Sequence, residues 1–410
     1  MDEIKKIAPE VYEILQKELK RQQETLNLIP SENFVSKAVL EATGSVFTNK
    51  YVEGYPGKRY YPGCQFADEL ESLCINLAKK VFNLGESWQV HVQPLSGSPA
   101  NLAIYSGLLN PGDKILSMEL THGGHLSHGY KVHISSKFWS TIHYGVNEEG
   151  YINYEKIREI ALKEKPKLII SGATAYPRII DFQKFYQIAK EVGAYHLADI
   201  SHIAGLIAAK LHPSPFKWAD VVMTTTHKTL RGPRSAVIFV RQELYEKIRK
   251  AVFPGLQGGS HQHIICAKAV AFIEALKPEF IEYQNQIIKN AKTLAEELKK
   301  YGFKLLTDGT DNHLILVNLR ELIDASLAET LLEKANILAN RNSIPGDTSP
   351  FKPTGLRLGT PAVTTRKMKE KEMVIIAKWI YEILIERKNP EDIKQQVIKL
   401  CKQFPIYEHI

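Results

Sequence analysis

Short apolar runs alternate with helical patterns in the middle of the chain, between residues 90 and 240. The apolar runs cover residues 167–170, 195–198, 221–223 and 236–240. A helical pattern over residues 181–192 separates the first two runs, and its apolar side is formed by Phe185, Ile188, Ala189 and Val192. Continuous apolar strands that alternate with helices are typical of a mainly parallel sheet with both faces covered. The pattern therefore predicts an α/β fold.

Amphipathic helices are predicted on both sides of this region. The first covers residues 9–26, and the second begins at Pro278 and ends at Gly302. Their apolar positions at helical spacing are Val11, Ile14, Leu15 and Leu19 in the first and Ile281, Ile288, Ala291, Ala295 and Leu298 in the second. From residue 27 to residue 63 the chain is rich in Gly, Pro, Tyr, Ser and Asn without periodicity. An irregular segment of this length inside a compact chain is usually functional.

These patterns divide the chain into three parts. We expect an N-terminal helical arm at residues 1–45, a large α/β domain at residues 46–277 and a small C-terminal α+β domain at residues 278–410. Beyond the helix that starts at Pro278, short strand-like runs and a helix near residues 326–335 support the separate small domain.

Composition places the chain among ordinary globular proteins. It has 410 residues, of which 44% are apolar and 24% are charged. The net charge is +8, but the basic residues are spread along the chain, and no basic patch alternates with aromatic residues. We therefore expect a solvated basic surface and no nucleic-acid partner.

The cysteines and the N-terminus bear on the compartment. Cys64, Cys74, Cys266 and Cys401 lie far apart and form no CxxC pair, so we expect neither a disulfide framework nor a zinc site. The first residues lack the apolar segment of a signal peptide, and no apolar run approaches the roughly 20 residues that span a bilayer. We expect a cytoplasmic protein without a membrane-spanning segment.

A lysine marks the end of one predicted strand. Lys228 follows the apolar run 221–223 within a stretch of threonines, and a Gly-Pro pair breaks the chain shortly after it. Open α/β sheets bind their ligands at such strand ends, and lysine is the side chain that forms Schiff bases with carbonyl compounds. The alternative is a surface lysine that follows a strand.

An aspartate marks the end of another strand. Asp199 closes the apolar run 195–198, where a buried carboxylate needs a partner. If the ligand is pyridoxal phosphate, an aspartate keeps the pyridine nitrogen protonated and makes the ring an electron sink. The alternative is an N-cap for a helical turn that starts near His202. An acidic and a basic strand end in one sheet fit this cofactor better than either residue alone.

A phosphate group requires backbone N–H groups and small hydroxyls. Residues 96–101, Ser-Gly-Ser-Pro-Ala-Asn, lead into a helical pattern and offer both at a helix N-terminus, where the helix dipole also favours an anion. A plain capping turn is the alternative. The segment Gln257-Gly258-Gly259 is a second flexible loop with exposed amides, but a single glycine pair is weak support.

Three histidines follow one another at a period of three residues, His122, His125 and His128. They are candidates for metal ligands, for a flat ring stacked on a planar cofactor, or for structural side chains. The intervening glycines disfavour a rigid helix that would aim the three rings at one ion. No carboxylate partner lies in register, so we expect no metal site.

The chain resembles serine hydroxymethyltransferases along nearly its whole length. The motifs that carry the resemblance are LIPSEN at residues 28–33, NKYVEGYPGKRYY at 49–61, SGSPAN at 96–101, GGH at 123–125, TTTHKT at 224–229 and GLRLGTP at 355–361. The resemblance implies a fold-type I pyridoxal-phosphate enzyme. Such an enzyme reversibly transfers the serine hydroxymethyl carbon to tetrahydrofolate, or to a modified pterin, giving glycine and 5,10-methylenetetrahydrofolate.

The resemblance also implies roles for individual residues around the cofactor. Lys228 would bind it covalently, Asp199 would pair with the pyridine nitrogen, and His125 would stack on the ring. The other cofactor-binding residues implied are Tyr51, Ser96, Gly97, Ser98, Thr174, His202, Gln257, Gly258 and Gly259. Of these, Gln257 and Gly259 would come from the neighbouring subunit of a homodimer.

Further residues are implied for the two substrates. The amino-acid substrate would meet Ser31, Tyr61, His202 and Arg357, and the arginine would bind its carboxylate. Glu53, Tyr61 and His227 would assist catalysis. The partner chain would supply Tyr51, Glu53 and Tyr61 to the site. Alternatively, these residues belong to a tyrosine-rich loop that only packs against the rest of the chain. The folate-binding residues implied are Glu53, Leu120, Gly124, Leu126 and Asn342.

Two rival functions differ from this one. A folate-independent aldolase or transaldolase for 3-hydroxy amino acids on the same scaffold would keep Lys228, Asp199 and Arg357 but would not need Glu53 or Asn342. A basic RNA-binding protein with a vestigial enzyme fold would not need Lys228 or Asp199. Because all five residues are present, the sequence favours the transferase.

Overall fold

The computed structural model describes residues 2–408. Its N-terminal elements are α1 (Asp2–Ile7), α2 (Pro9–Glu24), β1 (Leu26–Asn27), α3 (Lys37–Thr43), β2 (Gly54–Tyr55) and β3 (Lys58–Arg59). Helix α2 confirms the first predicted helix and begins with Pro9, whose fixed φ suits a first turn. The segment 27–63 was expected to be irregular throughout. This expectation is wrong, because the segment contains α3 and the β2–β3 hairpin. These elements are too short for apolar periodicity to reveal them.

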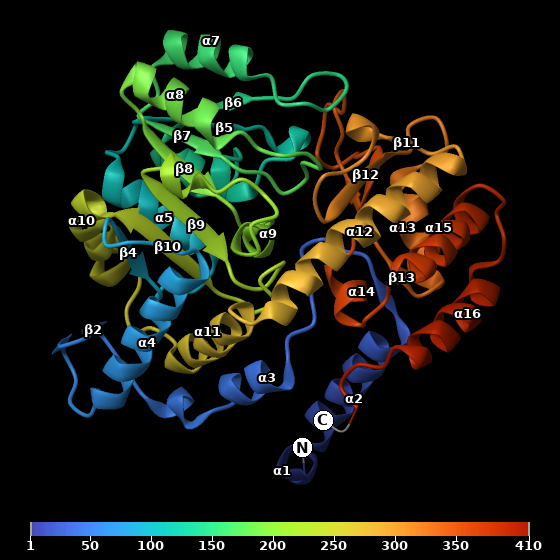
Figure 1. Cartoon of the computed structure of the whole chain (residues 1–410), viewed down its shortest axis with the longest axis horizontal. Helices are drawn as coiled ribbons and strands as arrows, with labels where there is room; N and C mark the ends of the chain where they lie inside the picture. Colours follow the sequence, from blue (N-terminus) through green and yellow to red (C-terminus); the bar gives the residue numbers. More distant parts are fainter. Residues whose placement is uncertain (1, 409–410) are drawn as a thin grey trace.

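A seven-stranded sheet forms the centre of the large part of the molecule (Figure 1). Its strands are β4 (Trp88–His91), β5 (Lys114–Met118), β6 (Ser140–Tyr144), β7 (Leu168–Ser171), β8 (Tyr195–Asp199), β9 (Val221–Thr225) and β10 (Ala236–Arg241). Their order is β4-β10-β9-β8-β7-β5-β6. Strand β10 is antiparallel to both its neighbours, and β9, β8, β7, β5 and β6 are parallel. The predicted α/β fold with a mainly parallel sheet is confirmed.

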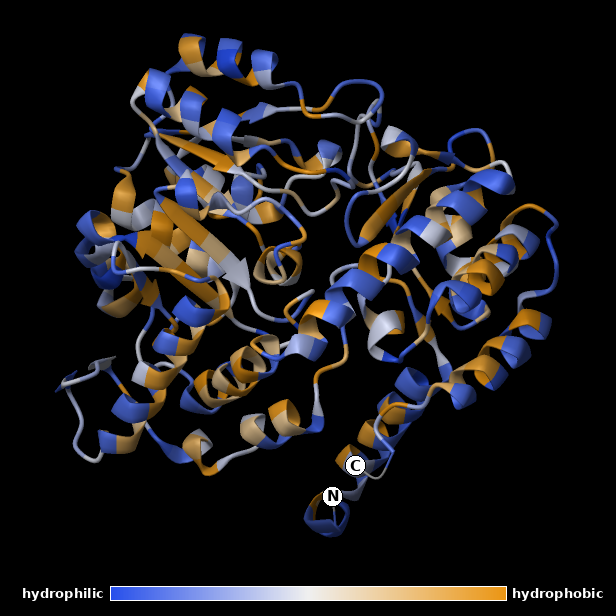
Figure 2. Cartoon of the chain, in the orientation of Figure 1, coloured by the Kyte–Doolittle hydropathy of each residue, from blue (hydrophilic) through white to orange (hydrophobic). Residues whose placement is uncertain are grey.

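Helices cover both faces of this sheet because successive side chains of each strand point to opposite sides. Along β9, Val221 and Met223 pack on one side, and Val222 packs on the other. The first side is covered by α5 (Gly97–Leu108) and α10 (Tyr245–Lys250). The second is covered by α4 (Gln65–Val81), α7 (Tyr154–Glu164), α8 (Phe182–Val192) and α11 (Gln262–Ala275). Figure 2 shows the apolar strands between helices that have one polar side.

A smaller antiparallel sheet lies beside the large one, in the order β11-β12-β15-β14. Its strands are β11 (Lys304–Leu305), β12 (Leu314–Asn318), β14 (Asn340–Asn342) and β15 (Gly355–Gly359). The helices of this part are α13 (Ala325–Lys334), α14 (Pro361–Thr365), α15 (Glu370–Leu384) and α16 (Pro390–Gln403). A short α9 (Ala204–Ala208) belongs to the large part.

One long helix, α12 (Pro278–Lys300), contributes to both hydrophobic cores. Phe280 packs in the core of the large sheet, and Leu294 and Leu298 pack in the core of the small one. The predicted start at Pro278 is confirmed, and Gly302 follows the helix with a φ of +85°. The expected core position Ile281 is wrong, because its side chain is exposed and the neighbouring Phe280 faces the core instead.

The end of the N-terminal segment joins the small sheet's core. Strand β1 pairs in parallel with β13 (Ile337–Leu338), and Leu26 and Leu28 are fully buried in the same cluster as Leu298. The segment 1–45 thus contacts the C-terminal part directly. The division at residues 45 and 277 stays a prediction.

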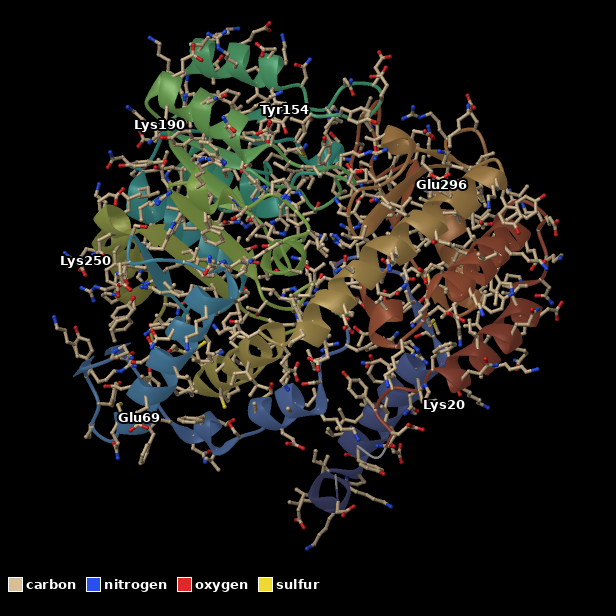
Figure 3. The ribbon with its side chains drawn as sticks, in the orientation of Figure 1. Lys20, Glu69, Tyr154, Lys190, Lys250 and Glu296 are labelled. Carbon is tan, nitrogen blue, oxygen red and sulfur yellow. The ribbon has the colours of Figure 1, made fainter. Side chains whose placement is uncertain are left out.

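Two surface properties bear on partners. Within residues 2–408, every helix is too short or too polar to cross a bilayer. Figure 3 labels Lys20, Lys190 and Lys250, which belong to three different helices and lie well apart. Lys190 is within 3.4 Å of Asp220, so part of the positive charge is locally balanced.

Candidate active site

A buried cavity of about 170 Å³ opens where strands β8 and β9 end and helix α5 begins. Its lining contains Ser96, Gly97, Ser98, Asn101, His125, His128, Ala173, Thr174, Asp199, Ser201, His202, Met223, Thr225, His227, Lys228 and Arg234. Parallel strands end at one edge of a sheet, so residues distant in sequence meet there. Nine of the predicted site residues line this cavity.

Lys228 presents an amine to the cavity. Its Nζ donates a hydrogen bond to Thr225 Oγ1 at 3.0 Å, and the side chain is buried. Burial lowers the pKa of Lys228 from 10.5 to about 8. Lys268 is also buried with a lowered pKa, but its Nζ donates to the carbonyls of Val92 and Ala236. Lys228 is therefore the buried lysine whose amine faces an open space.

Asp199, the last residue of β8, is held by four hydrogen bonds. Its Oδ2 accepts from His128 Nε2 at 2.8 Å and from Asn101 Nδ2 at 3.1 Å, and its Oδ1 accepts from the Ser201 hydroxyl at 2.6 Å and the Ser201 N–H at 3.1 Å. Burial alone would raise the pKa of Asp199, but these donors outweigh it and hold the pKa below its ordinary value. Through its bond to the Ser201 N–H, Asp199 also caps the turn at residues 201–203, while the N-cap residue of α9 itself is Ile203.

The N-terminus of α5, with Ser96, Gly97 and Ser98, forms a cradle at one end of the cavity. Ser96 is the N-cap residue, and its side chain makes no capping hydrogen bond, so its hydroxyl is free to bind a ligand. A Cβ at Gly97 would lie 2.8 Å from Thr225 Cγ2, so a larger residue would close this end of the cavity. The free N–H groups and the helix dipole favour an anion here. Arg234 adds a positive charge to the same lining.

The three histidines of the 122–128 segment point to different partners. His122 Nδ1 accepts from Val146 N–H at 3.0 Å, His125 Nδ1 lies 2.7 Å from Ser127 Oγ, and His128 binds Asp199. Burial lowers the pKa of His125 to about 4. The arrangement gives the cavity a neutral, flat imidazole at His125.

Thr174 and His202 line the side of the cavity next to the small sheet, whereas Arg357 lies behind this lining and binds Thr174. Arg357, on β15, donates from Nη1 to Thr174 O at 2.6 Å and from Nε to Asn340 Oδ1 at 3.2 Å. Burial lowers the pKa of Arg357 to about 10. His202 Nδ1 lies 3.1 Å from His313 Nε2, which ties the cavity to the small part. The small part therefore contacts two residues of the cavity lining, Thr174 and His202.

Ser31 and His227 lie on a neighbouring cavity of about 670 Å³ beside α2 and α3. His227 lines both cavities, whereas Ser31 lines only this larger one. Burial lowers the pKa of His227 to about 3, with Lys228 and Arg234 adding to the effect, so its ring is neutral.

Six predicted site residues gather elsewhere on the same chain. They are Tyr51, Glu53, Tyr61, Gln257, Gly258 and Gly259. Tyr51 Oη lies 3.2 Å from Glu53 Oε1, and its ring centre lies 5.0 Å from that of Tyr61. A cavity of about 510 Å³ is bordered by Glu53, Gln257 and Gly258. None of the six lines the cavity around Lys228.

Of the residues expected to flank folate, Leu120 lines a further cavity, and Gly124, Leu126 and Asn342 are not part of its lining. This cavity of about 290 Å³ is also lined by His125 and reaches residues 348–351. Gly124 lets its backbone pass close to that of Met118, because a Cβ would lie 2.1 Å from Met118 O. Leu126 is exposed, and Asn342, on β14, donates from its side chain to Ser343 O at 2.7 Å.

Sequence reasoning missed five polar residues of the site. They are Asn101, His128, Ser201, Thr225 and Arg234. Asn101, His128 and Thr225 belong to segments that the sequence analysis singled out, so their positions were known while their partners were not. Only the folded sheet shows that Asn101 and His128 converge on Asp199.

Comparison with known proteins decides the family. Residues 4–380 match the family model described as Serine hydroxymethyltransferase. The chain belongs to the serine hydroxymethyltransferase family. The serine hydroxymethyltransferase of Nostoc sp. (strain PCC 7120) is 53% identical over 412 aligned residues, which cover 98% of this chain and 95% of that relative.

Membership of the serine hydroxymethyltransferase family settles the class of reaction. The chain is a pyridoxal-phosphate-dependent transferase that moves the hydroxymethyl carbon of serine reversibly to tetrahydrofolate and leaves glycine. The fold-type I architecture expected from the sequence agrees with the α/β sheet described above. No feature of the comparisons favours the aldolase.

Proposed function

We propose that the cavity around Lys228 holds pyridoxal phosphate and is the site of serine–glycine interconversion. The observation that supports this most is the convergence of an amine, an ionised carboxylate and a helix N-terminus with free hydroxyls in one buried space. An aldehyde, a pyridine nitrogen and a phosphate on one small molecule require these three groups. When bound, pyridoxal phosphate supplies an electron sink for the carbanion at the substrate α-carbon.

Residues of the large part would hold the cofactor. Lys228 would bind the aldehyde group through its amine, and a pKa lowered to about 8 leaves about half of that amine neutral at pH 8. Asp199 would keep the pyridine nitrogen protonated, and His125 would offer the cofactor ring a flat neutral imidazole. Thr174 and His202 lie on the side expected for the ring hydroxyl, and Ser96, Gly97 and Ser98 bind the phosphate. These roles are supported by the cavity lining.

The substrate amino acid would bind between the two parts of the chain. Arg357 orients its carboxylate, since a guanidinium matches a carboxylate with two parallel hydrogen bonds. Ser31, Tyr61 and His202 complete the substrate contacts, and His227 packs beside Lys228. Binding here excludes water, because Arg357 is already nine-tenths buried.

Two chains would build each site. Tyr51, Glu53, Tyr61 and the Gln257–Gly259 loop lie together, and none of them lines the cavity of their own chain. A homodimer that places this cluster over the partner's cavity adds a proton-transfer group and further phosphate ligands. Leu120, Gly124, Leu126 and Asn342 would flank the folate beside it. This dimer is supported by the exposed rings of Tyr51, Tyr60 and Tyr61. Clustered exposed aromatic side chains are typical of a surface that a partner covers.

We also propose a cytoplasmic location. All four cysteines are free thiols, which fits a reducing compartment.

Replacing Glu53 by glutamine separates the transferase from an aldolase. Transfer to tetrahydrofolate requires a proton at the serine hydroxyl or the folate-bound carbon, and a carboxamide cannot supply it. We expect tetrahydrofolate-dependent serine cleavage to fall about 100-fold. Cleavage of phenylserine, which releases an aldehyde without folate, should remain appreciable, and glycine affinity should stay near normal. Steady-state rates with both substrates test this.

The matched control is Glu69→Gln, an exposed carboxylate on α4, which should change neither rate. If Glu53 only organises the tyrosine loop, both reactions will fall together in a correctly folded dimer, and the proton-transfer role is wrong.

A mixing experiment tests the shared site. Lys228→Ala and Glu53→Gln are each expected to be nearly inactive in serine cleavage as homodimers. Random exchange of equal amounts gives hybrids with one intact site in half of the dimers, so about a quarter of the unmodified activity should return. Absence of recovery after exchange, verified by native mass spectrometry, would contradict the shared site.

A further inference from the structure

Gln93 lies where two loops with proposed roles in the partner's active site meet. It follows β4, it is 3% exposed, and the chain continues from it to the Ser96–Ser98 cradle. Nothing in the proposed chemistry uses this side chain. A buried side-chain amide destabilises the fold unless its polar groups make hydrogen bonds, so the partners of Gln93 are informative.

The Gln93 side chain binds the hairpin that carries Glu53. Its Nε2 donates to Gly54 O at 2.9 Å and to Glu71 Oε1 at 2.8 Å. Gly54 directly follows Glu53 and begins β2, so this bond fixes the peptide next to the carboxylate. A Cβ at Gly54, where φ is +91°, would lie 2.2 Å from Lys58 O, so the turn has little freedom of its own.

Glu71 anchors the arrangement to helix α4. It is 1% exposed, and its Oε2 accepts from Arg59 Nη2 at 2.8 Å. Arg59 also donates from Nη1 to Gly54 O at 2.6 Å. The Gly54 carbonyl therefore receives donors from both strand β3 and Gln93. Of these two donors, only Gln93 connects the hairpin to the central sheet.

The main chain of Gln93 binds the second loop. Gln257 Nε2 donates to Gln93 O at 2.8 Å. The two loops also touch directly: a Cβ at Gly258 would lie 3.2 Å from Glu53 Oε1, and Ser260 N–H donates to Val52 O at 3.2 Å. One residue thus sets the position of both loops against the end of β4.

We propose that Gln93 is a positioning residue that fixes Glu53 for delivery into the partner's active site. The inference rests on the proposed shared site. It carries a distinctive consequence: a substitution at Gln93 impairs the cavity of the other chain and spares the cavity of its own. Gln257 donates to the main-chain oxygen of Gln93, which a side-chain substitution at Gln93 does not remove. The substitution therefore leaves the Gln257–Gly259 loop in place.

The first test is hydrogen–deuterium exchange on the cofactor-loaded dimer without substrate. Gln93→Leu keeps the approximate volume and removes the donor, so exchange should accelerate about 10-fold in peptides covering residues 53–60. Peptides covering residues 257–260 should be unchanged. The control is Gln89→Leu, on β4 just before Gln93, whose side chain binds the exposed Gln242 at 2.6 Å. It should leave both regions unchanged. Unchanged exchange at residues 53–60 in Gln93→Leu would contradict the proposal.

The second test uses hybrid dimers isolated with two different affinity tags. Hybrid A pairs a Gln93→Leu chain with a Lys228→Ala chain, so its one working cavity receives Glu53 from a chain with Gln93 intact. Hybrid B pairs an unmodified chain with a Gln93→Leu/Lys228→Ala chain, so its working cavity receives the loosened hairpin. We expect serine cleavage per intact Lys228 to be near normal in A and about 10-fold lower in B. Phenylserine cleavage should be similar in both.

The outcomes separate this proposal from the shared site itself. Equal rates in A and B, or a loss confined to A, would overturn the positioning role, provided that the Lys228→Ala and Glu53→Gln mixture recovers activity. If that mixture does not recover, the shared site is wrong, and the role of Gln93 is wrong with it. Should Gln93→Leu fail to dimerise, Glu71→Gln in the same two hybrids must show the same asymmetry, because it weakens the anchor and keeps the side-chain shape.

Discussion

Lys228→Ala is expected to abolish the covalent link between the protein and pyridoxal phosphate. Lys228 Nζ is the amine that faces the cavity, whereas the other fully buried lysine, Lys268, is bound to two main-chain carbonyls. Borohydride reduction followed by intact-mass measurement should show the cofactor mass on the unmodified protein and none on the variant. The visible absorption of the unmodified protein should be lost or shifted, and serine cleavage should fall to background.

The pH dependence of cofactor attachment checks the same residue. Burial lowers the pKa of Lys228 from 10.5 to about 8, so the neutral, nucleophilic fraction of the amine increases as the pH rises to about 8. The rate at which cofactor-free protein forms the link should rise over that range and level off above it. The exposed Lys217→Ala serves as the control and should retain the link. A reduced adduct that persists in Lys228→Ala would contradict the assignment.

Asp199→Asn is expected to reduce turnover far more than cofactor binding. The carboxylate is held ionised by His128, Ser201 and Asn101 inside the cavity, which suits it to hold a proton on a ring nitrogen. An amide of the same shape keeps most of the packing and loses the charge. The kcat for serine cleavage should fall about 10²- to 10³-fold. Cofactor occupancy, measured by absorbance after gel filtration, should change much less.

Asp220→Asn is the matched control for Asp199→Asn, because it also removes one aspartate charge. Asp220 precedes strand β9 and accepts from His196 N–H at 2.8 Å, outside the cavity lining. It should leave kcat near normal. An equal loss of occupancy and turnover in Asp199→Asn would instead assign Asp199 a structural role, in which its bonds to His128 and Asn101 hold the cavity together.

Much of the fold was predictable from short-range patterns. The strand ends at Asp199 and near Lys228 follow from apolar runs bounded by polar residues, and parallel strands bring such ends to one edge. Helix α8 follows from its apolar stripe, and Asp181 caps it by accepting from Lys184 N–H at 3.1 Å. These features depend on neighbours within a few residues.

Contacts between distant segments were not predictable in this way. No local signal indicates that His128 binds Asp199, that β1 pairs with β13, or that Gln93 holds Gly54. The error at Ile281 has the same cause. Phe280 and Ile281 are adjacent apolar residues that both fit the helical period, and only the packing of α12 shows that Phe280 is the buried one. The clustering of Glu53 with Gln257 also emerges only from the folded chain.

The central claim is that the serine carbon passes to tetrahydrofolate at the site built around Lys228. The most direct measurement follows serine labelled with ¹³C at the β-carbon by NMR, with and without tetrahydrofolate, using the cofactor-loaded protein. The account predicts that the label appears in 5,10-methylenetetrahydrofolate, that glycine forms in equal amount, and that turnover falls to a small residual rate when tetrahydrofolate is omitted. Release of the label as free formaldehyde at the same rate with and without tetrahydrofolate would contradict it.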